Sequence, residues 1–258
     1  MPDRPRSSYR ELPAPEALAP YVACLWEHTI GDGEVVYDQP VLPDGCIDLV
    51  VLDGEVILAG PATRPVRLEL APGSVLAGVR FRPGGAPPLL GVGAAELRDL
   101  EVPVGDLWGR PGAEIVERSV EAPGPAERLE VLTDAIAERI GGAAAIDPVA
   151  TGVAAMLARR PAVPVRSLAD QVALSERQLR RRVEDAVGYP PRTLARILRF
   201  QRFLRLARAV PTGRRDLAGL AAEVGYADQA HLTRESRQLA GLPPAALLDW
   251  EARRLGKV

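Results

Sequence analysis

The residues most clearly suited to bind a ligand are three arginines in the second half of the chain, Arg177, Arg180 and Arg181. At 100° per residue they lie on one face of a helix, opposite Leu179 and Val183. A guanidinium group can make two parallel hydrogen bonds to guanine O6 and N7, or to a phosphate. An apolar seam with arginines behind it is what a helix in the DNA major groove requires, although a solvated surface helix can have the same pattern.

A second set of polar residues repeats this arrangement further along the chain. Asp228 is placed to cap a helix over 229–240, in which Leu232 faces inward as Leu179 does 53 residues earlier. Arg234 projects outward. His231 can donate to a base or a phosphate, or can simply support the first turn of its helix. A helical hairpin can imitate one such unit by chance, whereas two copies with basic outer faces favour DNA binding.

Each set is carried by a short helix, a tight turn and a second helix. In the first unit we expect Ser167 and Ser175 to cap the two helices, and the second unit begins at Asp216 and turns at Gly225-Tyr226. A long helix over Pro191–Ala209 joins the units. Its arginines cover the side away from the core, where most are expected to be solvated and one or two to contact phosphate; they are Arg196, Arg199, Arg202 and Arg205.

The segments 168–182 and 217–241, followed by Ala240-Gly241-Leu242-Pro243-Pro244, closely resemble the DNA-binding domain of AraC/XylS-type transcription regulators. The resemblance covers roughly residues 147–250. It implies that the two recognition helices enter successive major grooves on one side of a DNA duplex. The implied base-reading residues are Arg177, Arg180, Arg181, Gln229, Ala230, His231 and Arg234.

This sequence departs from the family pattern at two positions, Val183 and Ser236, where the family usually has an aromatic residue and Phe. A serine that faces the core contributes less apolar contact and brings a hydroxyl that needs a partner. The second unit would then be looser than the pattern implies. An interaction module that has lost DNA binding is therefore one alternative.

The charge of the 258-residue chain is unevenly distributed. The formal net charge is −2, but residues 146–258 hold 20 basic and 11 acidic side chains, and residues 1–145 hold 12 and 23. All basic residues except Lys257 are arginines, which can reflect codon bias as well as phosphate binding. Such asymmetry indicates two units with different partners, the basic one a candidate for nucleic acid.

The first half is predicted to be mostly β-structure, in short strands separated by Gly and Pro. The strands are expected over 22–30, 35–42, 46–52, 55–59, 66–70 and 75–81. Asp53-Gly54 between two of them predicts a two-residue hairpin, because both positions need positive φ. This spacing indicates a small barrel or sandwich. After it we expect an irregular loop over 82–88, a short helix over 94–99 and a mixture of loop and helix over 111–125.

From residue 125 the apolar period becomes helical, and Gly141-Gly142 stops the first helix before Asp147 caps the next. The predicted fold class is therefore α+β. A β-rich barrel-like or sandwich-like domain with a C-terminal helix (1–145) precedes an all-α domain of two helix-turn-helix units (146–258).

The first half also resembles the sensory modules that precede AraC-type DNA-binding domains, including a poorly characterised group with a Pro-Asp-Gly-Cys strand and an Arg-Phe-Arg-Pro-Gly-Gly loop. The resemblance implies binding of a small-molecule effector or dimerisation. The candidate effector-binding residues are Trp26, Cys46, Arg80 and Arg82, with core packing the alternative for the first two and a structural bend for the arginines. Trp108 is a further candidate, also open to core packing.

Composition excludes several classes of protein. No apolar run reaches the 18–20 residues or so of a membrane span, and Cys24 and Cys46 are too few for a disulfide framework. His28 is the only histidine of the first half, which argues against a metal site there. We expect a cytoplasmic protein without cofactor or metal, and without a membrane partner.

The leading hypothesis is a sequence-specific transcription regulator that is not an enzyme, controlled by a small-molecule effector. Its partners would be double-stranded DNA, the effector, a second copy in a homodimer, and RNA polymerase if it activates transcription. The rival is a DNA-repair enzyme that accepts alkyl groups on Cys46, although no histidine is positioned to activate that thiol.

Overall fold

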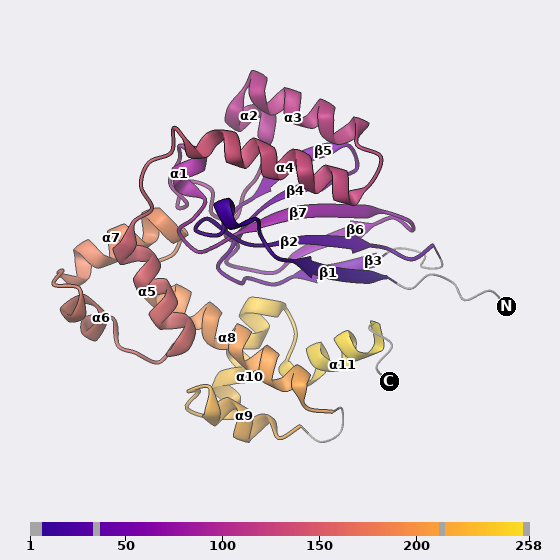
Figure 1. The fold of residues 1–258 in the computed structure, drawn as a ribbon. Helices are drawn as coiled ribbons and strands as arrows, with labels where there is room; N and C mark the ends of the chain where they lie inside the picture. Colours follow the sequence, from indigo (N-terminus) through magenta and orange to yellow (C-terminus); the bar gives the residue numbers. More distant parts are fainter. Residues whose placement is uncertain (1–6, 33–36, 212–214, 255–258) are drawn as a thin grey trace.

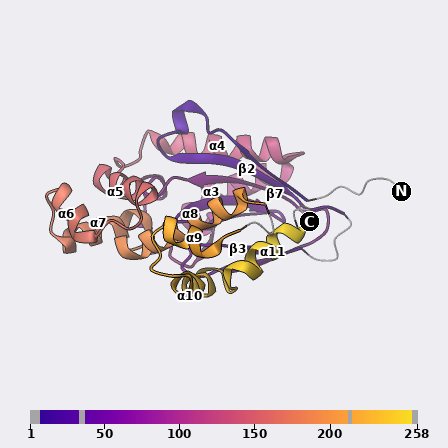
Figure 2. The ribbon, with the colours of Figure 1, turned by 90° about the horizontal axis from the view of Figure 1, so that it is seen from below.

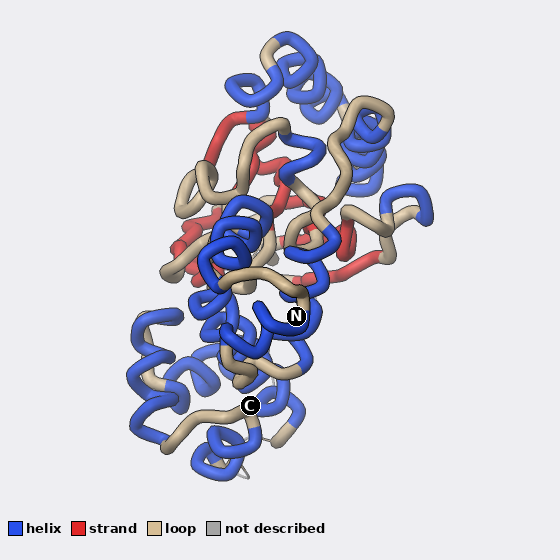
Figure 3. The backbone as a smooth tube through the Cα atoms, turned by 90° about the vertical axis from the view of Figure 1, so that its left-hand side faces the viewer, coloured by secondary structure: helices blue, strands red, loops and turns tan. Residues whose placement is uncertain are grey.

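The structure is a computed structural model that describes residues 7–32, 37–211 and 215–254. Strands dominate the first half of the chain, here called the sheet half, and within the described residues the second, helical half contains only helices (Figures 1 and 3). The predicted α+β class is confirmed. The strands are β1 (Ser8–Leu12), β2 (Val22–Thr29), β3 (Tyr37–Val41), β4 (Ile47–Leu52), β5 (Glu55–Ala59), β6 (Val66–Leu70), β7 (Val75–Phe81) and β8 (Glu101–Pro103).

Six strands form one antiparallel sheet in the order β1-β2-β7-β4-β5-β8. Its helices are a 3₁₀ turn η1 (Glu16–Leu18), α1 (Pro87–Leu90), α2 (Val104–Trp108), α3 (Arg110–Glu121) and α4 (Pro125–Ile140), of which α3 and α4 cover one face (Figure 1). Alternation along β4 places Leu49 and Val51 in a core with Leu132 and Ile136 of α4. The intervening Val50 belongs to a different core on the opposite face.

That opposite face is covered by a second sheet of two antiparallel strands, β3 and β6. Leu70 of β6 packs with Trp26, Val50 and Leu76 of the large sheet in a small apolar cluster. The sheet half is therefore sandwich-like. A sandwich is one of the two architectures predicted from the sequence, the other being a barrel.

Local turn chemistry explains the boundary between β4 and β5. Asp53 and Gly54 have φ values of 49° and 82°, which confirms the two-residue hairpin between β4 and β5. Of the strand expected over 35–42, residues 35 and 36 lie outside the described residues and the rest contains β3. The edge strands β1 and β8 were not predicted.

Two expectations about the segment after β7 are wrong. Pro87 and Pro88 begin the one-turn helix α1 instead of continuing the loop, because proline fits the first helical position and Leu89 and Leu90 enter the core. The helix predicted over 94–99 is a series of turns. Asp99 ends it in a left-handed conformation with φ 58°, and its carboxylate accepts hydrogen bonds from the amide and hydroxyl of Thr63. The segment 111–125, expected as a mixture, is mostly α3.

The helical half contains α5 (Pro148–Arg159), α6 (Val165–Gln171), α7 (Glu176–Val187), α8 (Pro191–Ala209), α9 (Leu217–Glu223), α10 (Gln229–Ala240) and α11 (Pro244–Arg254). The predicted caps Asp147, Ser175 and Asp228 each accept backbone N–H groups of the following helix. Asp216, at which the second unit begins, caps α9 in the same way. The cap predicted at Ser167 is wrong, because α6 begins two residues earlier, after Pro164.

The two helix pairs are α6–α7 and α9–α10, and both pack on α8. Figures 1 and 2 place the first pair at one end of the molecule and the second below the sheets. Leu179, Val183 and Leu232 are fully buried in one shared core with Leu194 and Ile197 of α8. Valine at 183 therefore fills its site in the core.

Ser236 is also fully buried, and its hydroxyl donates a 2.7 Å hydrogen bond to the carbonyl of Leu242. The Ser236 hydroxyl therefore has a hydrogen-bond partner, which the segment after α10 supplies. Neither departure from the family pattern leaves a buried polar atom unpaired.

Candidate functional site

The arginines of α7 lie at its N-terminal end. A capping box fixes this end, because Ser175 accepts from the amide of Gln178 and the side chain of Gln178 accepts from the amide of Ser175. Arg177, Arg180 and Arg181 are all exposed on the resulting helix, opposite the buried Leu179. Arg180 lies 3.5 Å from Glu184, one turn further along.

The predicted residues of α10 fall into two groups. Gln229, Ala230 and Arg234 are exposed. His231 is partly buried: its ring packs edge-on against Tyr226, with centroids 5.1 Å apart, and its Nε2 lies 3.6 Å from a carboxylate oxygen of Glu235. His231 thus contacts its own helix and Tyr226, and its side chain remains 31% exposed.

Behind α10 lies a group of charges around the buried Glu235, which we call the basic centre: Arg196, Arg199, His231 and Glu235. The Glu235 carboxylate is 3.0 Å from Arg196 Nε and 2.8 Å from Arg199 Nη2. Burial alone would raise the pKa of Glu235, but the charges and hydrogen bonds of Arg199 and Arg196 outweigh it and hold the pKa below its ordinary value. The side chain of Arg199 is only 14% exposed, so the expectation that it is solvated is wrong.

Two open grooves connect the arginines of α7 with those of α10. One, of about 490 Å³, is lined by Arg177 and Arg180, and the other, of about 930 Å³, by Arg196 and Arg234. Both grooves are lined by Val165 and Arg192, so they form one continuous surface. We call it the basic face. Arg192 was not singled out from the sequence, but its spacing of four and seven residues from Arg196 and Arg199 would have found it.

A cavity of about 380 Å³ lies between the two sheets of the first half. Apolar side chains of both sheets line most of it, among them Val50, Leu52, Ile57, Val66, Leu68 and Leu76. The predicted residues Trp26, Cys46 and Arg80 line it as well, so the structure brings three of the four together. Arg82 does not line it, because this exposed side chain turns away to the carbonyl of Ala19. Trp108 also lies elsewhere, in the helix-covered core with Arg139 over its ring.

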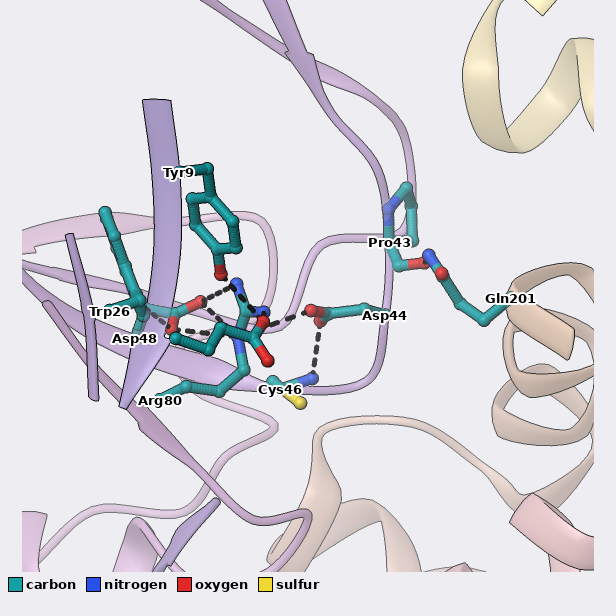
Figure 4. Close-up of polar contacts among 9 residues, drawn as sticks. Tyr9, Trp26, Pro43, Asp44, Cys46, Asp48, Arg80 and Gln201 are labelled. Carbon is teal, nitrogen blue, oxygen red and sulfur yellow. Dashed lines mark hydrogen bonds and ion pairs between the residues drawn. The ribbon is translucent and has the colours of Figure 1, made fainter. Parts of the chain in front are cut away.

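The polar end of the cavity is built around Arg80 (Figure 4). Its Nε lies 3.1 Å from Asp48 and 3.6 Å from Asp44, and its Nη1 lies 3.8 Å from Glu11. Trp26 donates a 3.0 Å hydrogen bond to Asp48. We call Arg80 and its three carboxylates the acidic centre. Arg80 was predicted from the sequence, but its carboxylate partners were not. Asp48 becomes a partner because it lies directly opposite Arg80 in the pairing of β4 with β7.

The cavity is joined to the helical half by the loop that leads into β4. Pro43, which lines the cavity, accepts a 2.7 Å hydrogen bond from Gln201 of α8 (Figure 4). Ala62, also in the lining, accepts a 2.6 Å bond from the buried hydroxyl of Tyr189. These two hydrogen bonds join walls of the cavity to α8 and to the residue Tyr189 that shortly precedes it.

A second contact between the halves reaches the end of α7. Asp185 accepts a 2.8 Å hydrogen bond from the amide of Ala94, and Glu184 pairs with Arg98 at 3.0 Å. Because Glu184 also faces Arg180, one carboxylate lies between the sheet half and a candidate base-reading arginine.

Other classes of site find no support in the described part of the chain. No group of three or more His, Cys, Asp or Glu side chains there is arranged to hold a metal ion. None of the helices described is both long and apolar enough to cross a membrane.

Comparison with known proteins identifies two domains. Residues 10–103 match the family described as "Domain of unknown function (DUF6597)", and residues 168–249 match the family described as "Helix-turn-helix domain". No curated protein sequence matches the chain.

Solved structures of regulators show a distant likeness. ToxT from Vibrio cholerae is 11% identical with a TM-score of 0.44, covering 95% of this chain and 97% of that chain. ToxT bound to (E)-4-(8-methylnaphthalen-1-yl)but-3-enoic acid is 9% identical with a TM-score of 0.44, covering 95% and 97%. The regulator CdpR from Pseudomonas aeruginosa is 18% identical with a TM-score of 0.35, covering 70% and 47%.

The domain match falls on the two helix pairs that carry the arginines. The chain therefore carries a helix-turn-helix domain of the AraC type over residues 168–249.

Proposed function

We propose that the protein is a sequence-specific regulator whose DNA binding is controlled by a small molecule in the cavity of the sheet half. The observation that carries the first part is the basic face, which is continuous from α7 to α10. Helices α7 and α10 would enter two successive major grooves on one side of the duplex, about 10 base pairs apart.

The residues of the basic face divide by exposure. Arg177, Arg180 and Arg234 of the basic face would read base edges. The exposed Arg181 of α7 and Gln229 of α10 lie outside the groove linings and would do the same, and Ala230 offers a methyl contact. Arg192 and Arg196 lie between the two helices, where the phosphate backbone would pass. His231 would position α10.

Control by an effector would act through the contacts between the halves. The Pro43 and Ala62 carbonyls belong to cavity walls and hold α8 and Tyr189 in place. A ligand that favours one arrangement of these walls would shift the population of arrangements in which α7 and α10 fit the same duplex.

We place the boundary between the two domains at 145/146, in the loop between α4 and α5. Two copies bound side by side would form a homodimer on DNA, and RNA polymerase would be a partner if the outcome is activation.

The alternative, alkyl transfer to Cys46, is disfavoured by the surroundings of that thiol. Burial raises its pKa well above the ordinary value, and Asp44 and Asp48 raise it further. A nucleophilic thiol needs the opposite environment, a nearby cation or base that stabilises the thiolate.

A gel-shift series on genomic fragments tests the proposal, since we expect a few fragments to bind far more tightly than random DNA of equal length. Binding should weaken steeply as salt rises, because each phosphate contact releases counterions. Equal affinity for every fragment would show that the protein does not read sequence.

A single substitution tests the role of the first reading helix. We expect Arg181→Ala to relax base preference at one position of the site, at a cost of about 1–3 kcal/mol. Arg205→Ala, at an exposed position of α8, is the matched control. An equal loss of affinity for all sequences would make Arg181 a phosphate contact.

A further inference from the structure

The cavity between the sheets holds more negative than positive charge at its polar end. Asp48 and Asp44 lie 3.1 and 3.6 Å from Arg80, so two lining carboxylates face one guanidinium there. Asp99, Glu101 and Arg64 also line the cavity, which gives four carboxylates and two guanidiniums and a net charge of −2. The side chains of Asp48 and Arg80 are only 15% and 24% exposed, so water screens the charges of this pair poorly.

Arg80 is already occupied. Its Nε and Nη2 lie 3.1 and 3.3 Å from the two oxygens of Asp48, on the strand beside its own. A ligand carboxylate beside this pair would add a third negative group to Asp48 and Asp44. The Arg80 end of the cavity therefore opposes an anionic group.

Asp48 also lacks full compensation. Burial raises its pKa to about 6 even though Arg80 lowers it, because the cost of removing the carboxylate from water exceeds what the ion pair returns. Asp44 raises the pKa further. A second positive charge near Asp48 and Asp44 would stabilise both carboxylates in their ionised form.

Aromatic rings lie beside this charge. The Tyr9 and Trp26 ring centroids are 6.1 Å apart, and His28 meets Tyr9 edge-on at 6.0 Å. All three rings line the cavity, and Figure 4 shows Tyr9 and Trp26 close to the Arg80–Asp48 pair. The faces of Trp and Tyr attract cations.

We propose that the cavity binds a small organic cation, an amine whose charged end meets Asp44 and Asp48 and whose aryl or alkyl body lies between the sheets. The volume of about 380 Å³ is at the small end of ordinary ligand pockets. This inference rests on the proposed function, in which the same cavity is the effector site, and it names the chemical class of the effector.

Calorimetric titration of the full chain at pH 7.5 with three matched probes tests the inference. The probes are 3-phenylpropylamine, 3-phenylpropan-1-ol and 3-phenylpropanoate, which share one body and differ in charge. We expect the amine to bind at least about ten-fold more tightly than the alcohol or the carboxylate, the weight of one partly screened charge contact.

Asp44→Asn locates the charge that binds the amine. The asparagine side-chain oxygen can still accept the hydrogen bond from the Cys46 amide, so the loop keeps its turn. We expect this variant to lose about ten-fold in affinity for the amine and little for the alcohol. Asp106→Asn, at an exposed position of α2 outside the cavity lining, should change neither.

Two results would overturn the inference. If 3-phenylpropanoate binds as tightly as the amine, the cavity can still be an effector site, but it does not select a cationic ligand. If neither 3-phenylpropylamine nor benzyltrimethylammonium binds, the cavity does not bind an organic cation. The gel-shift series contains no amine, so it reports on DNA recognition separately from either result.

Discussion

The acidic centre and the basic centre are built from the same two groups in opposite proportion. Around Arg80, one guanidinium faces three carboxylates, whereas around Glu235 one carboxylate lies within 3.0 Å of two guanidiniums. The pKa of Asp48 is accordingly raised by burial, and that of Glu235 is held below its ordinary value by Arg199 and Arg196.

This difference indicates what each centre leaves uncompensated. The excess of negative charge at the acidic centre borders the cavity between the sheets and suits a small cation. The excess of positive charge at the basic centre borders an open groove and suits a polyanion such as DNA. Helix α8 connects them, because Gln201 binds the cavity loop and Arg196 and Arg199 lie on the same helix.

The largest expected effect comes from removing the single carboxylate of the basic centre. Glu235→Ala leaves Arg199 with a buried and unpaired charge, which should lower the free energy of unfolding by about 3–5 kcal/mol. Urea unfolding measures it, with Glu223→Ala at an exposed position of α9 as the control. A loss no greater than that of the control would mean that these ion pairs are as weak as surface pairs.

The stability of the acidic centre should decrease as pH rises, whereas that of the basic centre should decrease as pH falls. Because the folded pKa of Asp48, about 6, lies above its ordinary value of 3.8, stability should fall as pH rises from about 4 to about 6, by about 3 kcal/mol. The pKa of Glu235 is lowered, so its contribution is instead lost as pH falls below its ordinary value of 4.5. The groups that face Asp48 are Arg80, Asp44, Trp26 and Cys46, with Glu11 and Tyr9 around Arg80.

Unfolding of the wild type and of Asp48→Asn at pH 4, 5, 6 and 7 separates the two contributions. The variant should become more stable relative to the wild type as pH rises to 6, because only the wild type loses a proton there. Curves that stay parallel across this range would show that Asp48 does not titrate near pH 6.

The smallest expected effect concerns the link between the centres. Gln201→Ala removes one hydrogen bond and should cost about 1 kcal/mol of stability. It should also reduce the change in DNA affinity that 3-phenylpropylamine causes, measured by fluorescence anisotropy. Gln171→Ala, at an exposed position of α6, is the control. An unchanged response would place the coupling at Tyr189 or Glu184 instead.

Local rules predicted much of the fold. The hairpin at Asp53-Gly54, the cap at Asp147 and the whole of α8 depend on residues near in sequence, and all three are confirmed. Segment 94–99 has a helical pattern but forms turns, in which the amide of Asp99 bonds to the carbonyl of Pro61 and Asp99 itself is left-handed. That contact joins residues far apart in sequence, and the pattern of one segment does not contain it.

The same limit applies to the sites. The helical period identified the exposed arginines of α7 because exposure there depends on one helix alone. It misassigned Arg199, whose burial depends on Glu235 of another helix, and it could not find Asp44 and Asp48 as partners of Arg80 without the strand register. Arg82 was a candidate because, with Arg80 and the loop Pro83-Gly84-Gly85, it could hold an anion, yet its side chain bends toward Ala19.

Tyr189 has a practical consequence. Its ring is fully buried and its hydroxyl bonds to Ala62 of the sheet half, so a fragment that begins at residue 146 would uncover a phenol that no longer has its acceptor. Such a fragment, expressed by itself, would expose this aromatic side chain just after α7. The helices and the sandwich are better purified and assayed as one piece.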